Sequence, residues 1–242
     1  MRLLRKLLPL AGIAILLLGW DLAVRSSSSM ILPGPGKVFL ALVELARKGL
    51  LVRHVVASLF RVTWGFLGAV VFAIPLGIIL GWNRRLGLSV SPFLEILRPI
   101  SPLAWIPIAI LWFGVGDPSA IFIIFLGSLL PMTVASMNAI RSVPQIHVNA
   151  GKNFGLSDLE LLRRVVLPSI LPQLFVALRL TLGVAWLVVV AAEMIAVRSG
   201  LGFLIVDSRN AGDRYDLVIA GMVLIGLIGI ALDAGIRKVE VR

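Results

Sequence analysis

The sequence predicts an all-α membrane protein with about six membrane-spanning helices. Of its 242 residues, 59% are hydrophobic and only 14% are charged, and the mean hydropathy is +1.04. A soluble chain of this composition could bury a core but could not cover it with polar surface, so we expect a lipid bilayer around it. A helix needs roughly 20 apolar residues to cross a bilayer. Segments of about this length lie at 7–24, 55–81, 93–113, 121–140, 170–197 and 217–236.

The first apolar segment follows three basic residues near the N-terminus. A secretory signal peptide begins in the same way, but it ends in small residues at its cleavage site. Here Trp20 and Asp21 occupy that position. We therefore interpret residues 7–24 as an anchor helix that is retained.

A shorter helix is predicted from Lys37 to Leu50, after a turn rich in proline and glycine. Its apolar and charged residues separate onto opposite faces, which is typical of a helix that lies on the membrane surface. Residues 200–216 are also too polar to span, and we expect a short amphipathic helix or a re-entrant turn there. The predicted apolar face of the first of these helices consists of Phe39, Leu42, Val43, Ala46 and Leu50.

The distribution of lysine and arginine predicts that both termini lie in the cytoplasm. In this orientation the inner segments hold twelve of these residues and the outer segments hold eight, which is the direction of the positive-inside rule. The formal charge of +11 would also suit nucleic-acid binding, but no basic run is interleaved with aromatic residues, and we exclude that class. The first outer loop is discordant, because it holds five of the eight outer charges: Arg25, Lys37, Arg47, Lys48 and Arg53.

A polar segment interrupts the apolar pattern between the fourth and fifth predicted spans. It reads Asn-Ala-Gly-Lys-Asn-Phe-Gly over residues 149–155. We expect a short helix over residues 146–154 that stops at Gly155, because glycine readily adopts the left-handed conformation that ends a helix. The segment therefore predicts a sharp turn next to the membrane.

A second helix is expected to begin directly after this turn. Ser157 and Glu160 have the spacing of a capping box, and Leu156 and Leu161 are spaced as a hydrophobic staple. We expect this helix to be interrupted at Pro168, where the fifth span begins, because proline lacks the N–H of a helical hydrogen bond. The predicted unit is helix, turn and helix, joined to a span.

This polar segment resembles the cytoplasmic coupling loop of permease subunits in ATP-binding-cassette (ABC) importers. The family pattern is Glu-Ala-Ala, three residues, Gly, nine residues, an aliphatic residue, any residue, and Leu-Pro. Asn149 replaces the Glu and Gly151 replaces the second Ala, whereas Ala150, Gly155, Val165, Leu167 and Pro168 stand in register. The resemblance implies that a partner ATPase is contacted by Asn149, Ala150, Gly151, Lys152, Phe154, Gly155, Leu167 and Pro168.

Other segments are similar to permeases of the nitrate, sulfonate, taurine and bicarbonate group. They are Leu97 to Pro107 with Trp112-Phe113-Gly114, the fifth span from Leu178 to Met194, and Gly200 to Phe203 with Asp207 and Asn210. The resemblance implies the type I ABC importer permease fold. Residues 1–54 are then an N-terminal anchor with an external amphipathic segment, and residues 55–242 are the permease core, with the coupling loop at about 141–168.

The same resemblance implies an assembly in the inner cell membrane. Two permease subunits, here expected to be a homodimer, form the pore. Each docks on a cytoplasmic ATPase, and a separate solute-binding protein delivers the substrate.

The sequence shows no catalytic or metal-binding pattern of its own. Gly34-Pro35-Gly36-Lys37 is only a fragment of a phosphate-binding loop, since Val38 follows it. We expect no enzymatic activity and no cofactor, and we assign ATP hydrolysis to the partner. His54 and His147 are far apart, and no cysteine is present, so we expect no metal site.

Charged residues inside the predicted spans are candidates for the translocation pathway, because such charges usually face the bundle interior or a wet cavity. We assign Arg61, Arg98, Arg179 and Glu193 to this role. A positive potential from Arg98 or Arg179 would suit a small anion. The alternative is that these charges form structural ion pairs, as Glu95 and Arg98 could by their spacing.

The predicted function is the membrane subunit of an ATP-driven importer for a small anion such as nitrate, bicarbonate, taurine or an alkanesulfonate. The substrate itself stays open, and a permease for another small solute, such as a thiamine precursor, is an alternative. An ion-coupled secondary transporter would contain inverted repeats, and an intramembrane hydrolase would need a nucleophile beside a base. Neither pattern is evident in the sequence.

Overall fold

The computed structural model describes residues 2–26, 32–212 and 214–240, and in these residues it contains helices and no strands. The prediction of an all-α protein is confirmed. The α-helices are α1 (Arg2–Ser26), α2 (Pro35–Arg47), α3 (Leu50–Trp82), α4 (Arg84–Leu97), α5 (Ile106–Phe113), α6 (Asp117–Arg141), α7 (Gln145–Asn153), α8 (Asp158–Leu161), α9 (Leu167–Ala196), α10 (Leu201–Asn210) and α11 (Tyr215–Glu240), together with a 3-10 helix η1 (Pro102–Trp105) and a π-helical turn η2 (Leu162–Val166).

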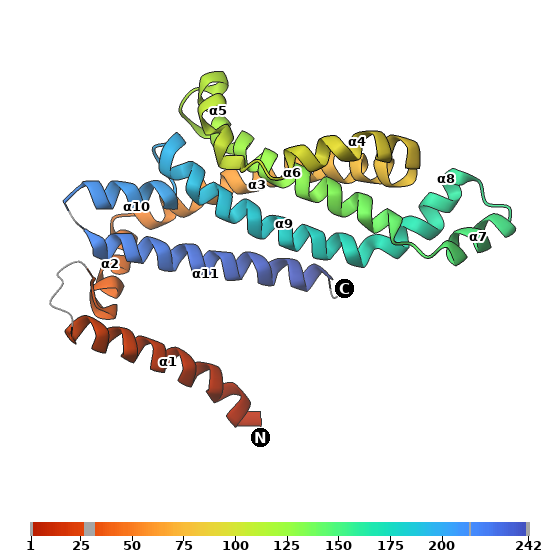
Figure 1. Ribbon diagram of the computed structural model, residues 1–242. Coiled ribbons are helices and arrows are strands. Elements are labelled where there is room, and N and C mark those ends of the chain that lie inside the picture. The colour runs from red at the N-terminus through yellow and green to blue at the C-terminus, as the bar shows by residue number, and fades with distance from the viewer. Residues whose placement is uncertain (1, 27–31, 213, 241–242) are drawn as a thin grey trace.

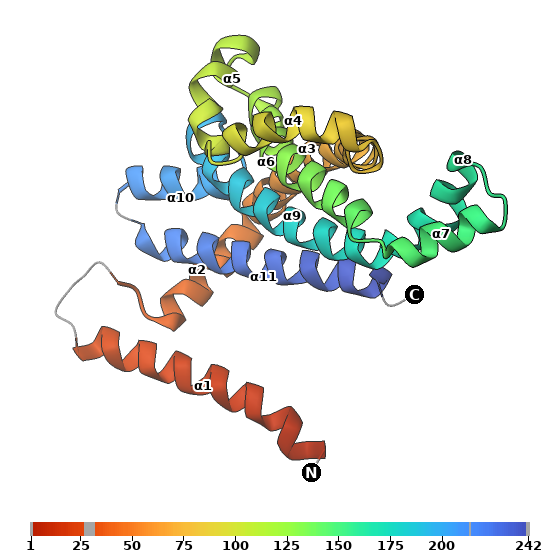
Figure 2. The same ribbon diagram turned by 45° about the vertical axis from the view of Figure 1, so that its right-hand side comes forward.

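The long helices run side by side in an elongated bundle. Figures 1 and 2 show α3, α6, α9 and α11 along its length, with α7 and α8 at one end. The helices α2 and α10 lie at the opposite end, and α1 stands apart from the bundle. We call the end that carries α7 and α8 the loop end, and the opposite end the far end.

Four helices in the described residues are long and apolar enough to cross a membrane: α3, α6, the continuous helix from Asp158 to Ala196, and α11 up to Lys238. They correspond to the second, fourth, fifth and sixth predicted spans. A fifth span is present if the bent pair of α4 and η1–α5 counts as one. The first predicted span lies in α1, where the side chains of residues 2–10 are outside the described part, so the total of six stays a prediction.

The third predicted span is not a continuous helix. Residues 84–97 and 102–113 form two helical pieces that meet at an angle of 81°. Pro99 and Pro102 favour the break, because proline lacks the N–H of a helical hydrogen bond, and Pro102 also disfavours helical geometry in Ser101 before it. The backbone of Ser101 is extended, and its side chain accepts a hydrogen bond from the Leu103 N–H, which starts the second piece. The predicted third span is therefore not one straight helix, and it stays a prediction that the bent pair crosses the membrane.

A stripe of small residues brings α3 and α6 together. It recurs every fourth residue along one face of α3. A Cβ added at Gly65 would lie 2.7 Å from the Cβ of Ile124, and one added at Gly77 would lie 2.6 Å from the Thr133 carbonyl oxygen. Small residues allow this close backbone approach, and such packing drives helix association in lipid. The stripe consists of Gly65, Ala69, Ala73, Gly77 and Gly81.

The helix α2 confirms the predicted amphipathic helix but not its buried face. Val38, Ala41 and Leu45 are buried against α10 and α11, in a cluster with Leu204 and Ala220. The side chain of Phe39, which was predicted on the apolar face, is 66% exposed. Which apolar residues of α2 are buried depends on how α2 packs against α10 and α11. The spacing of apolar residues in the sequence does not reveal this packing.

Candidate functional site

The polar segment at the loop end folds as predicted into a short helix and a sharp turn. The helix α7 ends before Gly155, whose φ is +77°. The Gly155 N–H donates to the Lys152 carbonyl over 2.9 Å, and the Leu156 N–H donates to the Gly151 carbonyl over 3.1 Å. This pair of hydrogen bonds is a Schellman motif, in which the residue after the helix takes the left-handed conformation. The direction in which α7 points is thus set by Gly155.

The predicted capping box begins the next helix. The Ser157 N–H donates to Glu160 Oε2 over 3.1 Å, and the Glu160 N–H donates to Ser157 Oγ. Because both reciprocal bonds form, the first exposed amides of α8 have partners.

The predicted interruption at Pro168 is wrong in its form. The helix continues from Asp158 to Ala196 and only widens into the π-helical turn η2, where the Leu167 N–H donates to the Leu162 carbonyl five residues earlier. Pro168 has no N–H to donate to an earlier carbonyl, and the wider turn before it lets the helix pass this position without a break between α8 and α9. The loop is therefore joined to its span by unbroken helix.

The two faces of α7 have different surroundings. On its outer face, the side chain of Ile146 is 71% exposed, and Asn149 and Ala150 are exposed beside it. On the inner face, Gly151 is buried, and a Cβ there would overlap Cδ1 of Leu161. The inner face is thus a structural contact with α8, whereas the outer face is free to meet a partner.

Exposed apolar side chains extend this outer face beyond α7. Phe154, in the turn, is 87% exposed, and Leu159 on α8 is 71% exposed. Both precede the predicted fifth span at residues 170–197. Exposed apolar side chains mark contact surfaces for a protein partner or a membrane. We call Ile146, Asn149, Ala150, Phe154 and Leu159 the outer patch.

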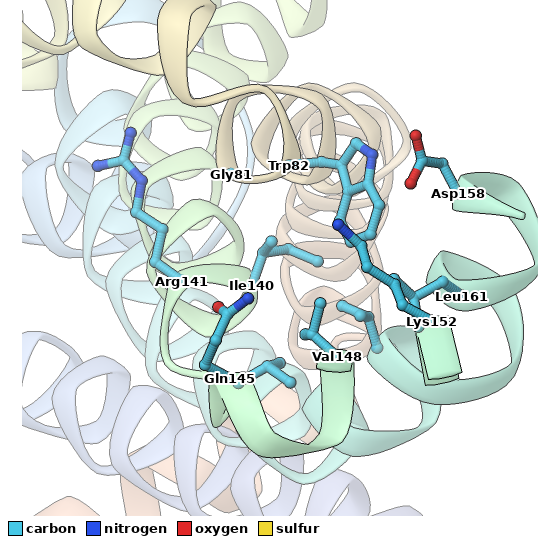
Figure 3. Close-up of a pocket in the computed structure, with 11 residues that line it drawn as sticks. Gly81, Trp82, Ile140, Arg141, Gln145, Val148, Lys152, Asp158 and Leu161 are labelled. Atoms are coloured by element: carbon cyan, nitrogen blue, oxygen red, sulfur yellow. The ribbon is translucent and has the colours of Figure 1, made fainter. Parts of the chain in front are cut away.

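The remaining predicted coupling residues surround this patch. Lys152 is exposed and lines a cavity of about 380 Å³ between α7 and the ends of α3 and α6, where Trp82 and Arg141 also lie (Figure 3). Leu167 and Pro168 stand further along, at the start of α9. The predicted coupling residues therefore lie in three places: on the outer face of α7, on its inner face against α8, and at the start of α9.

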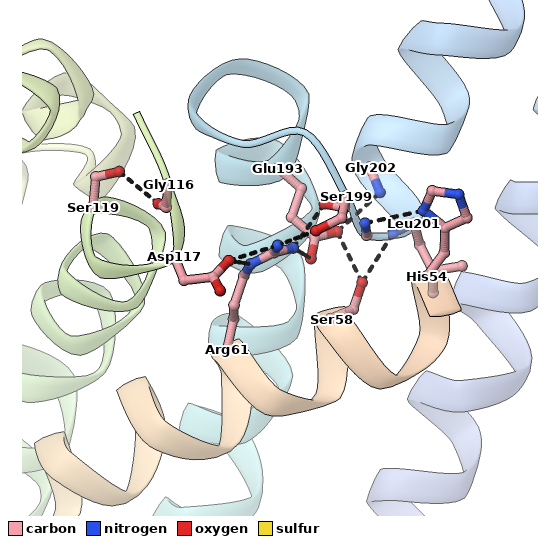
Figure 4. Close-up of polar contacts among 11 residues, drawn as sticks. His54, Ser58, Arg61, Gly116, Asp117, Ser119, Glu193, Ser199, Leu201 and Gly202 are labelled. Atoms are coloured by element: carbon pink, nitrogen blue, oxygen red, sulfur yellow. Dashed lines mark hydrogen bonds and ion pairs between the residues drawn. The ribbon is translucent and has the colours of Figure 1, made fainter. Parts of the chain in front are cut away.

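At the far end, two predicted pathway residues form one buried ion pair. Arg61 Nη1 of α3 donates to Glu193 Oε1 of α9 over 2.6 Å, and the side chains of Arg61 and Glu193 are 2% and 0% exposed (Figure 4). Arg61 Nε also donates to Asp117 Oδ1 at the start of α6 over 2.8 Å. A buried charge is costly unless it is paired and hydrogen-bonded in this way. One guanidinium thus joins the ends of α3, α6 and α9.

The same cluster fastens the connection between α9 and α10. Arg61 Nη1 donates to the Ser199 carbonyl over 2.7 Å, and the Gly202 N–H donates to Glu193 Oε2 over 3.0 Å. A Cβ at Gly202 would lie 2.8 Å from the Glu193 Cβ, and Gly200, with φ +106°, is closer still to the carboxylate. These contacts explain why glycines stand at both positions.

Ser58 and His54 complete the cluster from α3. Ser58 Oγ donates to Glu193 Oε2 and accepts from the Leu201 N–H, both over 2.9 Å, and His54 Nδ1 accepts from the Gly200 N–H over 3.1 Å. His54 is buried. Sequence reasoning also missed Ser58 and Asp117, for which no local pattern gives a signal.

The other two predicted pathway residues lie apart from this cluster. Arg179 pairs with Asp233 of α11, to which Arg237 Nε also donates over 2.9 Å. Arg98 is exposed at the break after α4 and lines a mainly apolar cavity of about 470 Å³ with Trp105 and Gly127. In the described part of the chain Arg98 forms no ion pair with Glu95. A role in transport stays a prediction for all four residues.

Comparison with known proteins identifies the family. A family model described as "Binding-protein-dependent transport system inner membrane component" matches residues 73–242. The taurine transport system permease protein of Escherichia coli is 34% identical, over 97% of this chain and 88% of that protein. The bicarbonate transport system permease protein of Synechococcus elongatus is 37% identical, over 94% of this chain and 85% of that protein. A putative ABC transporter permease protein of Methanocaldococcus jannaschii is 39% identical, over 91% and 85% of the respective chains.

The fold agrees with this family. A solved structure of the MetNI methionine ABC transporter in an inward-facing conformation matches with a TM-score of 0.71 and 22% identity, over 81% of this chain and 96% of that chain. This likeness confirms the predicted type I importer permease fold, and the sequence relatives favour the importer prediction over a secondary transporter. The chain therefore belongs to the family of binding-protein-dependent transport system inner membrane components, and it is a membrane-embedded permease subunit of an ABC importer.

Proposed function

We propose that this permease forms the pore for a small anion and couples its import to a separate cytoplasmic ATPase through the outer patch on α7 and α8. The observation that carries the proposal is the outer patch itself, which precedes the predicted fifth span and lies on a helix–turn–helix that continues as unbroken helix into α9. The chain itself hydrolyses no ATP in this proposal, and a solute-binding protein delivers the anion.

Docking would rest on packing more than on ion pairs. Ile146, Phe154 and Leu159 are apolar, and Asn149 stands where the family pattern has a glutamate. Burial of apolar surface is the main favourable term in most protein associations, and an interface without ion pairs responds weakly to ionic strength. Binding of the ATPase should therefore change little between low and high salt.

Motion of the docked helix has a direct route into the bundle. The core next to the loop end packs Val166 and Ile170, from the continuous helix, against Ala73 of α3 and Met132 of α6. Closely packed interiors move as units and do not deform gradually. A tilt of α7 would thus be carried through α8 and η2 to α9 and from there to α3 and α6.

The break after α4 supports a pathway near Arg98. Irregular backbone at membrane depth is tolerated only where protein covers it or where it lines a water-filled cavity. Residues 98–101 are exposed beside the cavity of about 470 Å³, and Arg98 is the one charged residue in its wall. A positive charge at this place favours an anion, and relatives named for taurine and bicarbonate transport fit that class. Arg61, Arg179 and Glu193, which the structure pairs with partners, act as structural ion pairs in this proposal.

We further propose a homodimer in the inner membrane with both termini in the cytoplasm. One subunit carries one coupling loop and so engages one ATPase, whereas two ATPases are needed if ATP binds between them. Figures 1 and 2 show the N-terminal end of α1 and the C-terminal end of α11 pointing towards the loop end, which supports termini on the side of the ATPase. A measured mass with one permease copy per complex would contradict the dimer.

Co-purification tests the docking proposal. Ile146→Glu places a charge in the outer patch, and a tagged permease with this change should retain little ATPase and transport no solute. Val115→Glu is the matched control, because Val115 is similarly exposed (61%) but lies in the connection between α5 and α6, outside the patch and outside any helix. Normal ATPase recovery and uptake with Ile146→Glu would overturn the proposed docking surface.

A further inference from the structure

A cavity of about 410 Å³ lies at the far end of the bundle, away from the coupling loop. Its walls come from α2, the first turn of α3, the connection before α10, α10 itself and the start of α11. The spans α3 and α11 begin at Leu50 and Tyr215, close to cavity residues Arg53 and Arg214. The cavity is therefore at the level where the spans leave the apolar layer, which is the level of the lipid headgroups.

Basic side chains dominate the charge of this cavity. Lys48, Arg53, Arg198 and Arg214 line it, against the acidic residues Glu44 and Asp207. Lys48 and Arg53 belong to the predicted first outer loop, which departs from the positive-inside pattern. The fold thus brings basic residues from three segments of the chain into one cavity. The positive-inside rule does not explain this concentration of positive charge.

Two of the cations have no partner among the described residues. Arg214 Nη2 donates to Glu44 Oε2 over 2.7 Å and to Asp216 Oδ2 over 2.9 Å, and Lys48 Nζ donates to Glu44 Oε1 over 2.6 Å. These bonds hold the pKa of the Glu44 carboxyl below its ordinary value, so Glu44 is an anion at neutral pH. In the part of the chain that the structure describes, Arg53 and Arg198 are exposed and form no ion pair.

We propose that this cavity binds the phosphate group of an anionic phospholipid, held by Arg53 and Arg198. A guanidinium donates two parallel hydrogen bonds to phosphate oxygens, which suits arginine better than lysine for this contact. Basic pockets between spans bind anionic headgroups on the cytoplasmic side of membranes, and the same attraction of opposite charges would act in this cavity at the far end. The exposed side chains of Phe39 and Leu40 on α2 would sit in the same interfacial layer, beside the acyl chains.

Lipid binding here would stabilise the far end of the permease. The occupied cavity would bridge α3 and the connection before α10, which the buried Arg61 cluster fastens from the inside. A ligand that binds only the folded state raises its thermal midpoint. The structure thus assigns the cavity a role in membrane-dependent stability, independent of the anion that is transported.

Titration of the full-length permease in nonionic detergent tests this proposal. Short-chain phosphatidylglycerol should raise the thermal unfolding midpoint saturably, and short-chain phosphatidylcholine should not. The double variant Arg53→Gln, Arg198→Gln should bind phosphatidylglycerol at least about tenfold more weakly, because two charged hydrogen-bond donors are lost. Lys37→Gln, Arg47→Gln removes the same charge from exposed positions of the same region that do not line the cavity, and it should bind as the unchanged protein does.

Sodium phosphate separates the two sources of the phosphate group. A full midpoint shift with phosphate alone supports a site for free phosphate, whereas a shift that needs the acyl chains supports a lipid site. Equal midpoints in phosphatidylglycerol and phosphatidylcholine would overturn the proposal. Equal loss of affinity in the two double variants would overturn it as well, because binding would then follow net charge alone.

Discussion

Gly151 on α7 and Leu161 on α8 fill the same space, so that a Cβ at Gly151 would overlap Cδ1 of Leu161. Leu161 is fully buried and has little room to move away. The family pattern has alanine at this position, and the smaller glycine allows Leu161 to lie directly against the α7 backbone. This contact fixes how closely α7 lies on the helix that enters the membrane.

Gly151→Ala should therefore push α7 away from α8. Overpacking of a buried contact costs about 1–3 kcal/mol, and the displaced helix should recover less ATPase in co-purification. Adding Leu161→Val to Gly151→Ala removes a methylene group at the point of overlap and should restore ATPase binding. If Gly151→Ala alone binds the ATPase as well as the unchanged protein, the inner contact does not set the position of α7.

Glu193→Gln tests whether the far-end ion pair is structural. Removing one partner of a buried pair costs about 3–5 kcal/mol because the other charge is left uncompensated. The thermal midpoint of the purified permease should fall clearly with Glu193→Gln. Asp117→Asn is the control and should lower the midpoint less, since the Asp117 side chain is 52% exposed and Arg61 keeps its buried partner Glu193 in this variant. An unchanged midpoint with slower uptake in Glu193→Gln would instead support the pathway role predicted from the sequence.

Arg98 and Arg179 should respond differently to the same change. Arg98→Gln should slow anion uptake without altering the thermal midpoint, because Arg98 lines a cavity and has no ion-pair partner in the described residues. An uptake rate reduced about tenfold corresponds to about 1.4 kcal/mol less stabilisation of the passing anion. Arg98→Lys, which keeps the charge, should retain most of the uptake.

Arg179→Gln should mainly loosen the contact between α9 and α11, because Arg179 pairs with Asp233. We expect a lower thermal midpoint and an uptake rate that falls only with the amount of folded protein. Uptake that is unchanged in Arg98→Gln but lost in folded Arg179→Gln would place the anion beside Arg179 instead.

Local signals predicted the turn at Gly155 and the capping box after it. Gly155 and the pair Ser157 and Glu160 act within one turn of helix, and such short-range rules can be read directly from a sequence. Pro99 and Pro102 are an equally local indication of the break in the third span. The span was predicted from the length of its apolar segment, which takes no account of these prolines. The stripe of small residues from Gly65 to Gly81 was also visible in the sequence, as a recurrence at every fourth position.

The far-end cluster could not be predicted in the same way. Arg61 and Glu193 lie 132 positions apart. In the sequence, each is an isolated charge within an apolar segment. Their pairing depends on how α3 and α9 cross, which no local period specifies. For the same reason the sequence pointed to a pathway role for residues that the fold pairs with one another.

We propose that α7, aimed by Gly155, transmits the motion of the ATPase, and Gly155→Val tests this coupling. A left-handed backbone costs an L residue about 1–2 kcal/mol, and no atom lies within 4 Å of the position that a Cβ would take. The strain is therefore in the backbone and not in packing. Gly155→Asn is the matched control, because asparagine tolerates this conformation.

The measurement is the amount of solute imported per ATP hydrolysed, in proteoliposomes that contain the permease, its ATPase and its binding protein. With Gly155→Asn this ratio should stay close to that of the unchanged protein. With Gly155→Val the permease should still insert in the membrane, but it should either fail to bind the ATPase or hydrolyse ATP without import. Normal import per ATP with Gly155→Val would contradict the account, since α7 would then not be the element that couples the ATPase to the pore.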